Sequence, residues 1–349
     1  MNDVFFKIVP YETCIQEVIS FRNANRILAR DRNYCRWRYE SRPCQHKAMV
    51  VWGTNREGCK VAAASIIPHD FYVLDDVYPV GLVGDISVTP EWRGRGVATQ
   101  LLQFLRQEPW LQTLRACMVL PNDDAARPLE RAGWSSATNI ARFVRIVDIS
   151  PRLQSRFGRR WPVVAAARAI NFLVKYGSMD GWQRRRTLSL SAEVGDFEYG
   201  FDDLWDEIPK RGKILALRDR RYLHWRYHEH PTVRYRIFQV RHGQLLRGYI
   251  VFHVAEDVAV IDDFLTADAM VGPWLFKEFL DHVRYGKLAA NIYLLYNADS
   301  FLAVPWARFG FVRRRDFQQV MVNVPEADRH SSLPSDENHW FITAGDKDV

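Results

Sequence analysis

The chain has 349 residues, of which 48% are hydrophobic and 13% are aromatic. This length is typical of two domains, and the apolar content is sufficient for two hydrophobic cores. The formal net charge of +7 is local, because residues 151–186 hold nine basic residues and one acid. That segment carries +8 and the remainder of the chain −1, which argues against a nucleic-acid-binding protein.

The cysteine pattern and the apolar runs exclude further classes. The five cysteines form neither a CxxC pair nor a Cys/His spacing of a metal site. We therefore expect reduced thiols, no metal ion and a cytoplasmic protein. Residues 1–18 lack the basic start and long apolar core of a signal peptide. No apolar run approaches the ~18 residues of a membrane-spanning helix.

The first 150 residues are predicted to form a mixed α/β domain in the order β-α-α-β-β-β-α-β-α-β. Helices are expected at 11–29, 30–39, 96–106 and about 123–132. Strands are expected at 5–8, 47–52, 60–67, 80–89, 115–120 and 143–148.

The segment between the strand at 80–89 and the next helix is the most informative one. A strand that runs into a glycine turn and a helix start directs several backbone N–H groups toward one point, together with the positive end of the helix dipole. Glycine allows the positive φ and the close approach that such a site needs. We therefore predict a phosphate- or pyrophosphate-binding loop formed by Arg93, Gly94, Arg95, Gly96, Val97 and Ala98.

Two common phosphate motifs do not fit this loop. A Walker A motif is excluded because no Gly-Lys-Ser/Thr follows, and the dinucleotide fingerprint fits poorly because Thr99 replaces its third glycine. The loop instead resembles the R/Q-x-x-G-x-G/A pyrophosphate loop of the Gcn5-related N-acetyltransferase (GNAT) superfamily. Residues 129–134 are similar to the later helix-Gly-aromatic turn of that family.

This resemblance implies an acyl-coenzyme A ligand, such as acetyl-CoA, and acyl transfer from a thioester to an amine. In such folds a backbone N–H of the strand before the loop, here between Ile86 and Val88, polarises the thioester oxygen. Asn122 stands where relatives often have an asparagine that contacts the pantetheine arm. Leu129 stands where many relatives have a tyrosine acid, so no general acid is assigned. No metal or redox cofactor is implied.

Asp85 is the predicted general base, because it lies on the strand beside the point where the thioester should lie. A structural carboxylate that pairs with a nearby arginine is an equal alternative for this residue. His69 and Asp70, at the end of the third strand, are the second choices for the base.

The chain also contains an internal duplication. Residues 30–39 return as 218–227 with the shared pattern Arg-Asp-Arg-x-Tyr-x-x-Trp-Arg-Tyr. Later residues of the two copies also match, but at a different separation along the sequence. The matching residues are Asp85 and Asp262, Thr89 and Thr266, and Gly133 and Gly310. A repeat of this length indicates two domains of one fold and not a solenoid.

We therefore predict two tandem GNAT-like domains, at 1–150 and 190–349, joined by a basic helical connector at 151–189. The second domain is expected to be degenerate, because Met270–Leu275 replaces the loop and contains a proline. Trp340 and Phe341 in the C-terminal tail are expected to dock onto a domain surface. In the second domain, helices are expected at 202–208, 218–227 and 274–283, and a further one, after the strand at 291–296, is expected to end at 309. Strands are expected at 235–240, 248–254, 259–265, 291–296 and 318–324.

The repeated arginines have two interpretations. Arg38 and Arg226 could line the substrate cleft and hold an anionic group, because a guanidinium suits a carboxylate or phosphate. The alternative is that the aromatic residues of this motif anchor a helix on the sheet while the arginines pair with acids.

The connector also has two interpretations. The apolar stretch Trp161–Tyr176, with aromatic ends and cationic flanks, resembles an interfacial helix for an anionic membrane. In the alternative, it packs its apolar side on both domains. The first would place the protein peripherally at the inner membrane surface.

The leading functional hypothesis is an acyl-CoA-dependent N-acyltransferase, with acetyl-CoA as donor and an amine of a carbohydrate or carrier-linked acceptor. A Fem-type aminoacyl transferase is one alternative, although such proteins generally lack an intact coenzyme loop. A non-catalytic, acyl-CoA-binding regulatory protein is the other. Coenzyme turnover with a panel of amines, or dependence on charged tRNA, separates these classes. The acceptor and the oligomeric state are not assigned.

Overall fold

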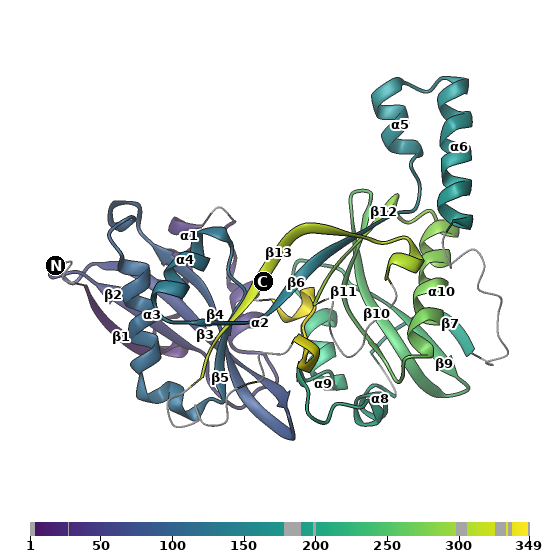
Figure 1. Cartoon of the computed structure of the whole chain (residues 1–349). Helices are drawn as coiled ribbons and strands as arrows, with labels where there is room; N and C mark the ends of the chain where they lie inside the picture. Colours follow the sequence, from purple (N-terminus) through teal and green to yellow (C-terminus); the bar gives the residue numbers. More distant parts are fainter. Residues whose placement is uncertain are drawn as a thin grey trace.

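The protein is described by a computed structural model at residues 4–26, 28–177, 190–197, 200–297, 306–324, 333 and 337–347. Its centre is one mixed sheet with the strand order β1-β2-β3-β4-β5-β13-β6-β12-β11-β10-β9-β7 (Figure 1). Strand β8 pairs with β3 and β14, beside this path. The mixed α/β class predicted from the sequence is confirmed.

The N-terminal elements follow the predicted order. The strands are β1 (Phe5–Pro10), β2 (Met49–Thr54), β3 (Lys60–Val73), β4 (Asp76–Val88), β5 (Ala116–Val119) and β6 (Ser135–Ile146). The helices are η1 (Tyr11–Thr13), α1 (Ile15–Asn25), α2 (Arg32–Tyr39), η2 (Pro90–Trp92), α3 (Val97–Gln107), η3 (Pro109–Thr113) and α4 (Asp123–Arg131). Strand β3 extends beyond the predicted residue 67, because its outer end pairs with both β4 and β8.

The connector forms α5 (Ser150–Phe157) and α6 (Trp161–Tyr176), and residues 178–189 lie outside the described part. The later strands are β7 (Leu190–Gly195), β8 (Ile214–Ala216), β9 (Arg236–His242), β10 (Leu245–Ala255), β11 (Val258–Thr266), β12 (Asn291–Tyr296), β13 (Val312–Asn323) and β14 (Trp340–Phe341). The later helices are α8 (Phe201–Glu207), α9 (Arg220–Leu223), η4 (His224–His228), α10 (Val271–Tyr285), η5 (Trp306–Phe309), η7 (Glu337–His339) and η8 (Ala344–Asp346).

The two ends of the sheet have the same pairing pattern. β1, β2, β3 and β4 pair antiparallel in turn, and β4 then pairs parallel with β5. β7, β9, β10 and β11 also pair antiparallel in turn, and β11 pairs parallel with β12. The side chains of Asp31 and Asp219 accept hydrogen bonds from the backbone N–H groups of Tyr34 and Tyr222, respectively. Each aspartate thereby caps the N-terminus of its helix, α2 or α9. The two ends of the sheet therefore share one pairing order and one type of helix cap, and the duplication itself stays a prediction.

The strands at the centre of the sheet are exchanged between its two ends. Strand β13, from the C-terminal half, lies between β5 and β6, and β6 in turn pairs with β12. The pairs Met321↔Val119 and Tyr293↔Val144 illustrate these long-range contacts. Each end of the sheet is therefore continued by a strand that comes from the other half of the chain.

Two tryptophans of the repeated motif join the halves. The indole Nε1 of Trp37 donates to the backbone oxygen of Trp225 at 2.8 Å, and Nε1 of Trp225 donates to the oxygen of Trp37 at 3.0 Å. The two rings stack with centroids 5.2 Å apart. One cluster of buried side chains, which includes both tryptophans, extends across the halves. The motif therefore forms part of an interface inside the chain.

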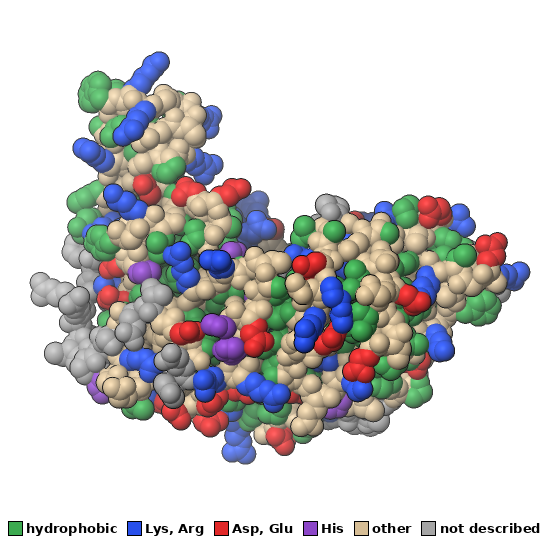
Figure 2. Space-filling model, turned by 180° about the vertical axis from the view of Figure 1, so that it is seen from behind, with side chains coloured by type: hydrophobic (Ala, Val, Ile, Leu, Met, Phe, Trp, Pro, Cys, Tyr) green, Lys and Arg blue, Asp and Glu red, His purple; other side chains and the backbone are tan. Residues whose placement is uncertain are grey.

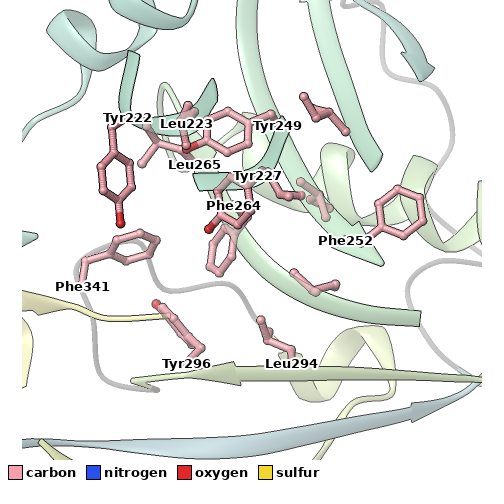
Figure 3. Packing of buried hydrophobic residues seen from close by; sticks show 14 of the residues in the cluster. Tyr222, Leu223, Tyr227, Tyr249, Phe252, Phe264, Leu265, Leu294, Tyr296 and Phe341 are labelled. Atoms are coloured by element: carbon pink, nitrogen blue, oxygen red, sulfur yellow. The ribbon is translucent and has the colours of Figure 1, made fainter. Parts of the chain in front are cut away.

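The C-terminal tail is built into the fold, as the sequence predicts. Trp340 and Phe341 are 2% and 0% exposed, and they pair with Ile214 and Leu215 of β8. Figure 3 shows Phe341 beside Tyr222 and Tyr296 in the aromatic core. These contacts fix the path of the chain that follows.

A buried ion cluster holds the same tail. Arg218 is 1% exposed, and its Nε lies 3.1 Å from both carboxylate oxygens of Asp263. Its Nη2 lies 2.8 Å from Oδ2 of Asp346, which belongs to the tail. A single guanidinium thus contacts two buried carboxylates.

Arg218→Met is expected to lower the free energy of unfolding by about 3–5 kcal/mol, because it leaves Asp263 and Asp346 buried without a cation. Arg221→Met, at an exposed position of α9 just after Arg218, is the control and should change it by less than ~0.5 kcal/mol. Guanidinium unfolding followed by circular dichroism measures both values. An equal, small effect of the two substitutions would contradict the role given to the cluster.

Candidate acyl-coenzyme A site

A notch opens in the sheet between β4 and β5. Their parallel pairing covers Val80–Leu82 and Ala116–Met118, but β4 continues to Val88 while β5 ends at Val119. Beyond Leu82 the pairing of the two strands ends, and no described strand pairs there with the β5-facing edge of β4. Ile86 and Val88, which the sequence assigns to coenzyme binding, lie on this stretch.

A bulge marks the same stretch of β4. Ala63 pairs with Ser87 and Ser65 pairs with Gly84, so Asp85 and Ile86 together face one residue of β3. Asp85 has φ +50°, in the left-handed region that non-glycine residues rarely adopt. Bulges re-aim side chains and backbone groups, and they concentrate at functional sites.

The predicted phosphate loop lies directly after the notch. Gly94 and Gly96 have φ of 73° and 77°, and Gly96 is the N-cap residue of α3. A Cβ built at either glycine would meet no atom within 4 Å. The backbone at both glycines is therefore open on that side, and the start of α3 is a helix N-terminus of the kind that can bind a phosphate.

Side chains of the loop and the apolar face of α3 fix its position. Nε of Arg93 donates to the backbone oxygen of Val88 at 3.0 Å, and the guanidinium of Arg95 lies over the ring of Trp92. Val97 is buried at the helix start, together with Leu101, Leu102 and Leu105 one and two turns later. This amphipathic face packs α3 on the sheet and holds its N-terminus at the notch.

Asn122 follows β5 on the other side of the notch. Its side chain accepts a hydrogen bond from the backbone N–H of Ala125 at 3.0 Å and so caps α4. This contact gives the residue a structural role beside the pantetheine contact that the family resemblance implies.

Asp85 lies in an ion cluster. Its Oδ1 is 3.1 Å from Nε of Arg22 and 3.4 Å from Nη2 of Arg26, and both arginines come from α1 or its end. Its Oδ2 is 3.1 Å from Nη2 of Arg38 and accepts a hydrogen bond from the hydroxyl of Tyr39 at 2.5 Å. Burial alone raises the pKa of Asp85, but the arginines outweigh it and lower that pKa to about 2.

This environment favours the structural alternative for Asp85. A carboxylate with so low a pKa is a weak proton acceptor near neutral pH. The cluster instead ties α1 and α2 to the bulge of β4, which holds the notch in shape. The sequence did not identify Arg22, Arg26 and Tyr39, which lie far from Asp85 along the chain.

The second choices for the base lie away from the notch. Burial lowers the pKa of His69 well below its usual value, and its ring packs near Tyr222 and Trp225 at the interface of the halves. Sγ of Cys44 lies 3.4 Å from Oδ1 of Asp70. The structure therefore does not bring His69 or Asp70 to the loop.

Arg38 and Arg226 occupy equivalent places in the repeat but have different partners. Arg38 pairs with Asp85, whereas Arg226 donates from Nε to the backbone oxygen of Gly345 at 2.9 Å. Nη2 of Arg226 also lies 3.3 Å from the oxygen of Lys347. Both guanidiniums are buried among these contacts, which favours their structural interpretation over substrate binding.

The corresponding notch of the C-terminal half holds the tail. β11 and β12 pair over Val258–Ile261 and Asn291–Leu294, and Tyr296 then bridges to Thr343 of the tail. A bulge lies at Asp262, whose Oδ2 is 2.6 Å from Nδ1 of His253. The chain's own residues thus fill the place where the N-terminal half offers its notch and loop.

The sequence did not anticipate a cavity of about 650 Å³ beside the end of β5. Asn122, Arg142, Asp316, Gln318 and Lys347 are among its lining residues. Gln318 ties its wall together, because its Nε2 donates to the backbone oxygens following β5, at 2.9 and 2.8 Å. Only the exchange of β13 brings these residues together, and no local pattern signals it.

Comparison with known proteins gives one family match, and it lies in the N-terminal half. Residues 20–116 match the family model described as an acetyltransferase (GNAT) domain. This GNAT domain match includes α2, β4, the loop and α3. No protein with a curated description matches the chain.

Solved structures share the fold over most of the chain. A GCN5-related N-acetyltransferase from Anabaena variabilis is 15% identical with a TM-score of 0.63, over 95% of this chain and 75% of that one. A probable N-acyltransferase from Enterococcus faecalis is 11% identical with a TM-score of 0.62, over 93% and 73%. N-myristoyltransferase from Saccharomyces cerevisiae, with bound myristoyl-CoA, is 10% identical with a TM-score of 0.54, over 91% and 82%. At these identities the similarity establishes the fold alone.

The described residues offer no alternative metal centre. Among them, no group of three or more His, Cys, Asp or Glu residues could hold a metal ion. All five cysteines are free thiols, and burial raises the pKa of Cys117, next to the notch on β5, to about 12.

Asp85→Asn is expected to cost about 3–5 kcal/mol of stability at pH 7, because it leaves buried arginines without their carboxylate. The pKa of Asp85 in the folded protein is lower than the ~3.9 of an unfolded Asp. Its stabilising effect is therefore present above about pH 4 and lost as the pH falls toward 2. Urea unfolding of wild type and variant between pH 3 and 7 should show the difference shrink with falling pH.

Asp75→Asn, at an exposed position of the β3–β4 turn, is the control for this series. A constant difference between wild type and Asp85→Asn across the pH range would contradict the ion-pair assignment.

Proposed function

We propose that the protein is an acyl-CoA-dependent N-acyltransferase with acetyl-CoA as the donor. The observation that carries this proposal is the continuity of three features, the notch after Leu82, the bulge at Asp85 and the glycine loop at the start of α3. These features follow one another along the chain, from the end of the β4–β5 pairing to the start of α3. This arrangement suits a thioester whose nucleotide end is held by a helix N-terminus.

In this proposal the donor is held mainly by backbone groups. The loop N–H groups from Arg93 to Ala98 bind the pyrophosphate, and a backbone N–H between Ile86 and Val88 polarises the thioester oxygen. The pantetheine arm passes between β4 and the residues after β5, where Asn122 lies. Transfer then forms an amide bond and releases the coenzyme thiol.

The acceptor amine is proposed to enter through the cavity lined by Arg142, Arg315 and Lys347. Asp316 is the acidic residue on its wall and lies 3.0 Å from Arg142. The surplus of cations suits an acceptor that also carries a phosphate or carboxylate. The amine must lose a proton, and solvent in this cavity is the proposed proton acceptor, since Asp85 is held as an ion pair.

The second half is proposed to be a degenerate copy that supports the first. Met270–Leu275 forms the end of a turn and the start of α10 and lacks the paired glycines. The tail, held by Arg218 and Arg226, occupies the second notch.

A protein that binds acyl-CoA without turnover is the second candidate function, and one observation favours it. Leu129 is fully buried at the place of the tyrosine acid.

Gly96→Asp tests the donor site. Asp tolerates a positive φ, so the fold should persist, whereas its carboxylate would face the pyrophosphate. Loss of one or two charge-assisted hydrogen bonds, ~1.5–3 kcal/mol each, weakens coenzyme A binding roughly tenfold or more. Calorimetry with wild type should give one coenzyme A per chain.

The matched control is Gly243→Asp, which places the same residue at a glycine with φ 59° and open space in the β9–β10 turn. It should leave the affinity unchanged. Two equivalent sites per chain, or equal affinity for Gly96→Asp and wild type, would overturn the assignment.

Turnover separates the two candidate functions. Release of coenzyme A thiol from acetyl-CoA should accelerate with an amine acceptor that carries an anionic group, and Gly96→Asp should abolish this at subsaturating donor. Tight binding of acetyl-CoA without transfer to any amine of the panel would favour the binding protein.

A further inference from the structure

Helices α5 and α6 form a hairpin that projects from the body of the protein (Figure 1). The C-terminal part of α6 is anchored to the body. Nη2 of Arg145 donates to the backbone oxygen of Val174 at 3.0 Å, and Nζ of Lys175 lies 2.9 Å from the hydroxyl of Tyr285. Asn171 holds the start of the hairpin, because its side chain contacts the N–H of Ile149 and the carboxylate of Asp148. The hairpin is thus a defined structure with a firm base.

The exposed side of α6 is apolar. Trp161, Phe172 and Leu173 are 82%, 61% and 67% exposed, whereas Ala167 is the buried residue of this helix. At 100° per residue, Trp161, Ala165, Phe172 and Tyr176 lie within about 60° of one another. Such a contiguous apolar face on the outside of a protein marks an interaction surface. The alternative from the sequence, a connector whose apolar side packs on both domains, does not describe this helix.

The hairpin is also strongly cationic. Residues 150–177 contain six basic residues and no Asp or Glu. The residues at the turn between the helices, Arg159 and Arg160, come directly before Trp161 and are exposed. Figure 2 shows Lys and Arg side chains around the projecting hairpin.

We propose that the α5–α6 hairpin docks the protein onto an anionic lipid surface. Exposed aromatic and aliphatic side chains enter the headgroup region, and adjacent arginines pair with lipid phosphates. A second copy of the chain is a poorer occupant, because two hairpins of +6 would repel each other. Nucleic acid would leave the apolar face exposed.

The helix geometry fits attachment without crossing. No described helix is long and apolar enough to cross a bilayer. With 16 residues, α6 spans about 24 Å and suits a position at the interface. The proposal does not depend on the acyltransferase assignment, since it uses neither the loop nor the notch.

Vesicle flotation of the full-length protein tests the proposal. The protein should float with vesicles of phosphatidylglycerol and phosphatidylcholine in equal parts, and stay at the bottom with phosphatidylcholine alone. Raising the salt from 0.05 to ~0.5 M should release most of it, because the Debye length falls to a few ångströms. Equal flotation with both vesicle types, or none with either, would overturn the proposal.

Two variants assign the effect to the hairpin. Removing both arginines in Arg159→Gln/Arg160→Gln should weaken binding roughly 25-fold, at about fivefold per residue. Trp161→Ser/Phe172→Ser should weaken it at least tenfold without changing the salt dependence. Both positions are exposed, so the fold should persist, and unchanged circular dichroism verifies this.

Matched control variants remove the same kinds of side chain outside the hairpin. Arg36→Gln/Arg211→Gln takes away two exposed cations, and Leu245→Ser/Met270→Ser takes away two exposed apolar side chains, 56% and 68% exposed. These variants should bind like wild type. Losses as large as those in the hairpin variants, or a salt-independent dimer formed through the hairpin in place of vesicle binding, would contradict the proposal.

Discussion

The exchange of strands at the centre of the sheet is the constraint on which the other features depend. β13 pairs with β5, and β6 pairs with β12, so the open edge of each half is covered by a strand of the other. An unpaired strand edge invites aggregation, and pairing it removes that risk. Gln318 on β13 also closes the wall of the cavity beside β5. The C-terminal half is therefore part of the candidate site even though its own loop is absent.

Both halves contain a β-bulge beside a notch in the sheet, but the surroundings of the bulge differ between them. Each has a bulge in the strand before its notch, at Asp85 and Asp262. In the N-terminal half, arginines neutralise Asp85, and the notch leads to a glycine loop. In the C-terminal half, Asp262 pairs with His253, and the notch is filled by residues of the tail. The notch that keeps the loop is therefore the one suited to a ligand.

Local patterns predicted the loop, the helices and most strands, because their signals lie within a few residues. The same patterns could not predict the strand exchange, since β13 has the same alternation whichever strand it pairs with. They also could not distinguish Arg38 from Arg226. The two share one motif, but Arg38 meets Asp85 while Arg226 meets a tail more than a hundred residues away. For α6, periodicity gave a helix, and only the three-dimensional structure shows which side faces solvent.

The strand exchange also bears on how the chain is made. β5 lies between β4 and β13, and Val119 pairs with Met321, about 200 positions later in the chain. At translation rates of about 5–20 residues per second, roughly 10–40 s pass before that partner is synthesised. During this time one edge of β5 must remain unpaired or be protected by another strand or a chaperone. The sheet of a newly made N-terminal half is thus incomplete until β13 has been synthesised.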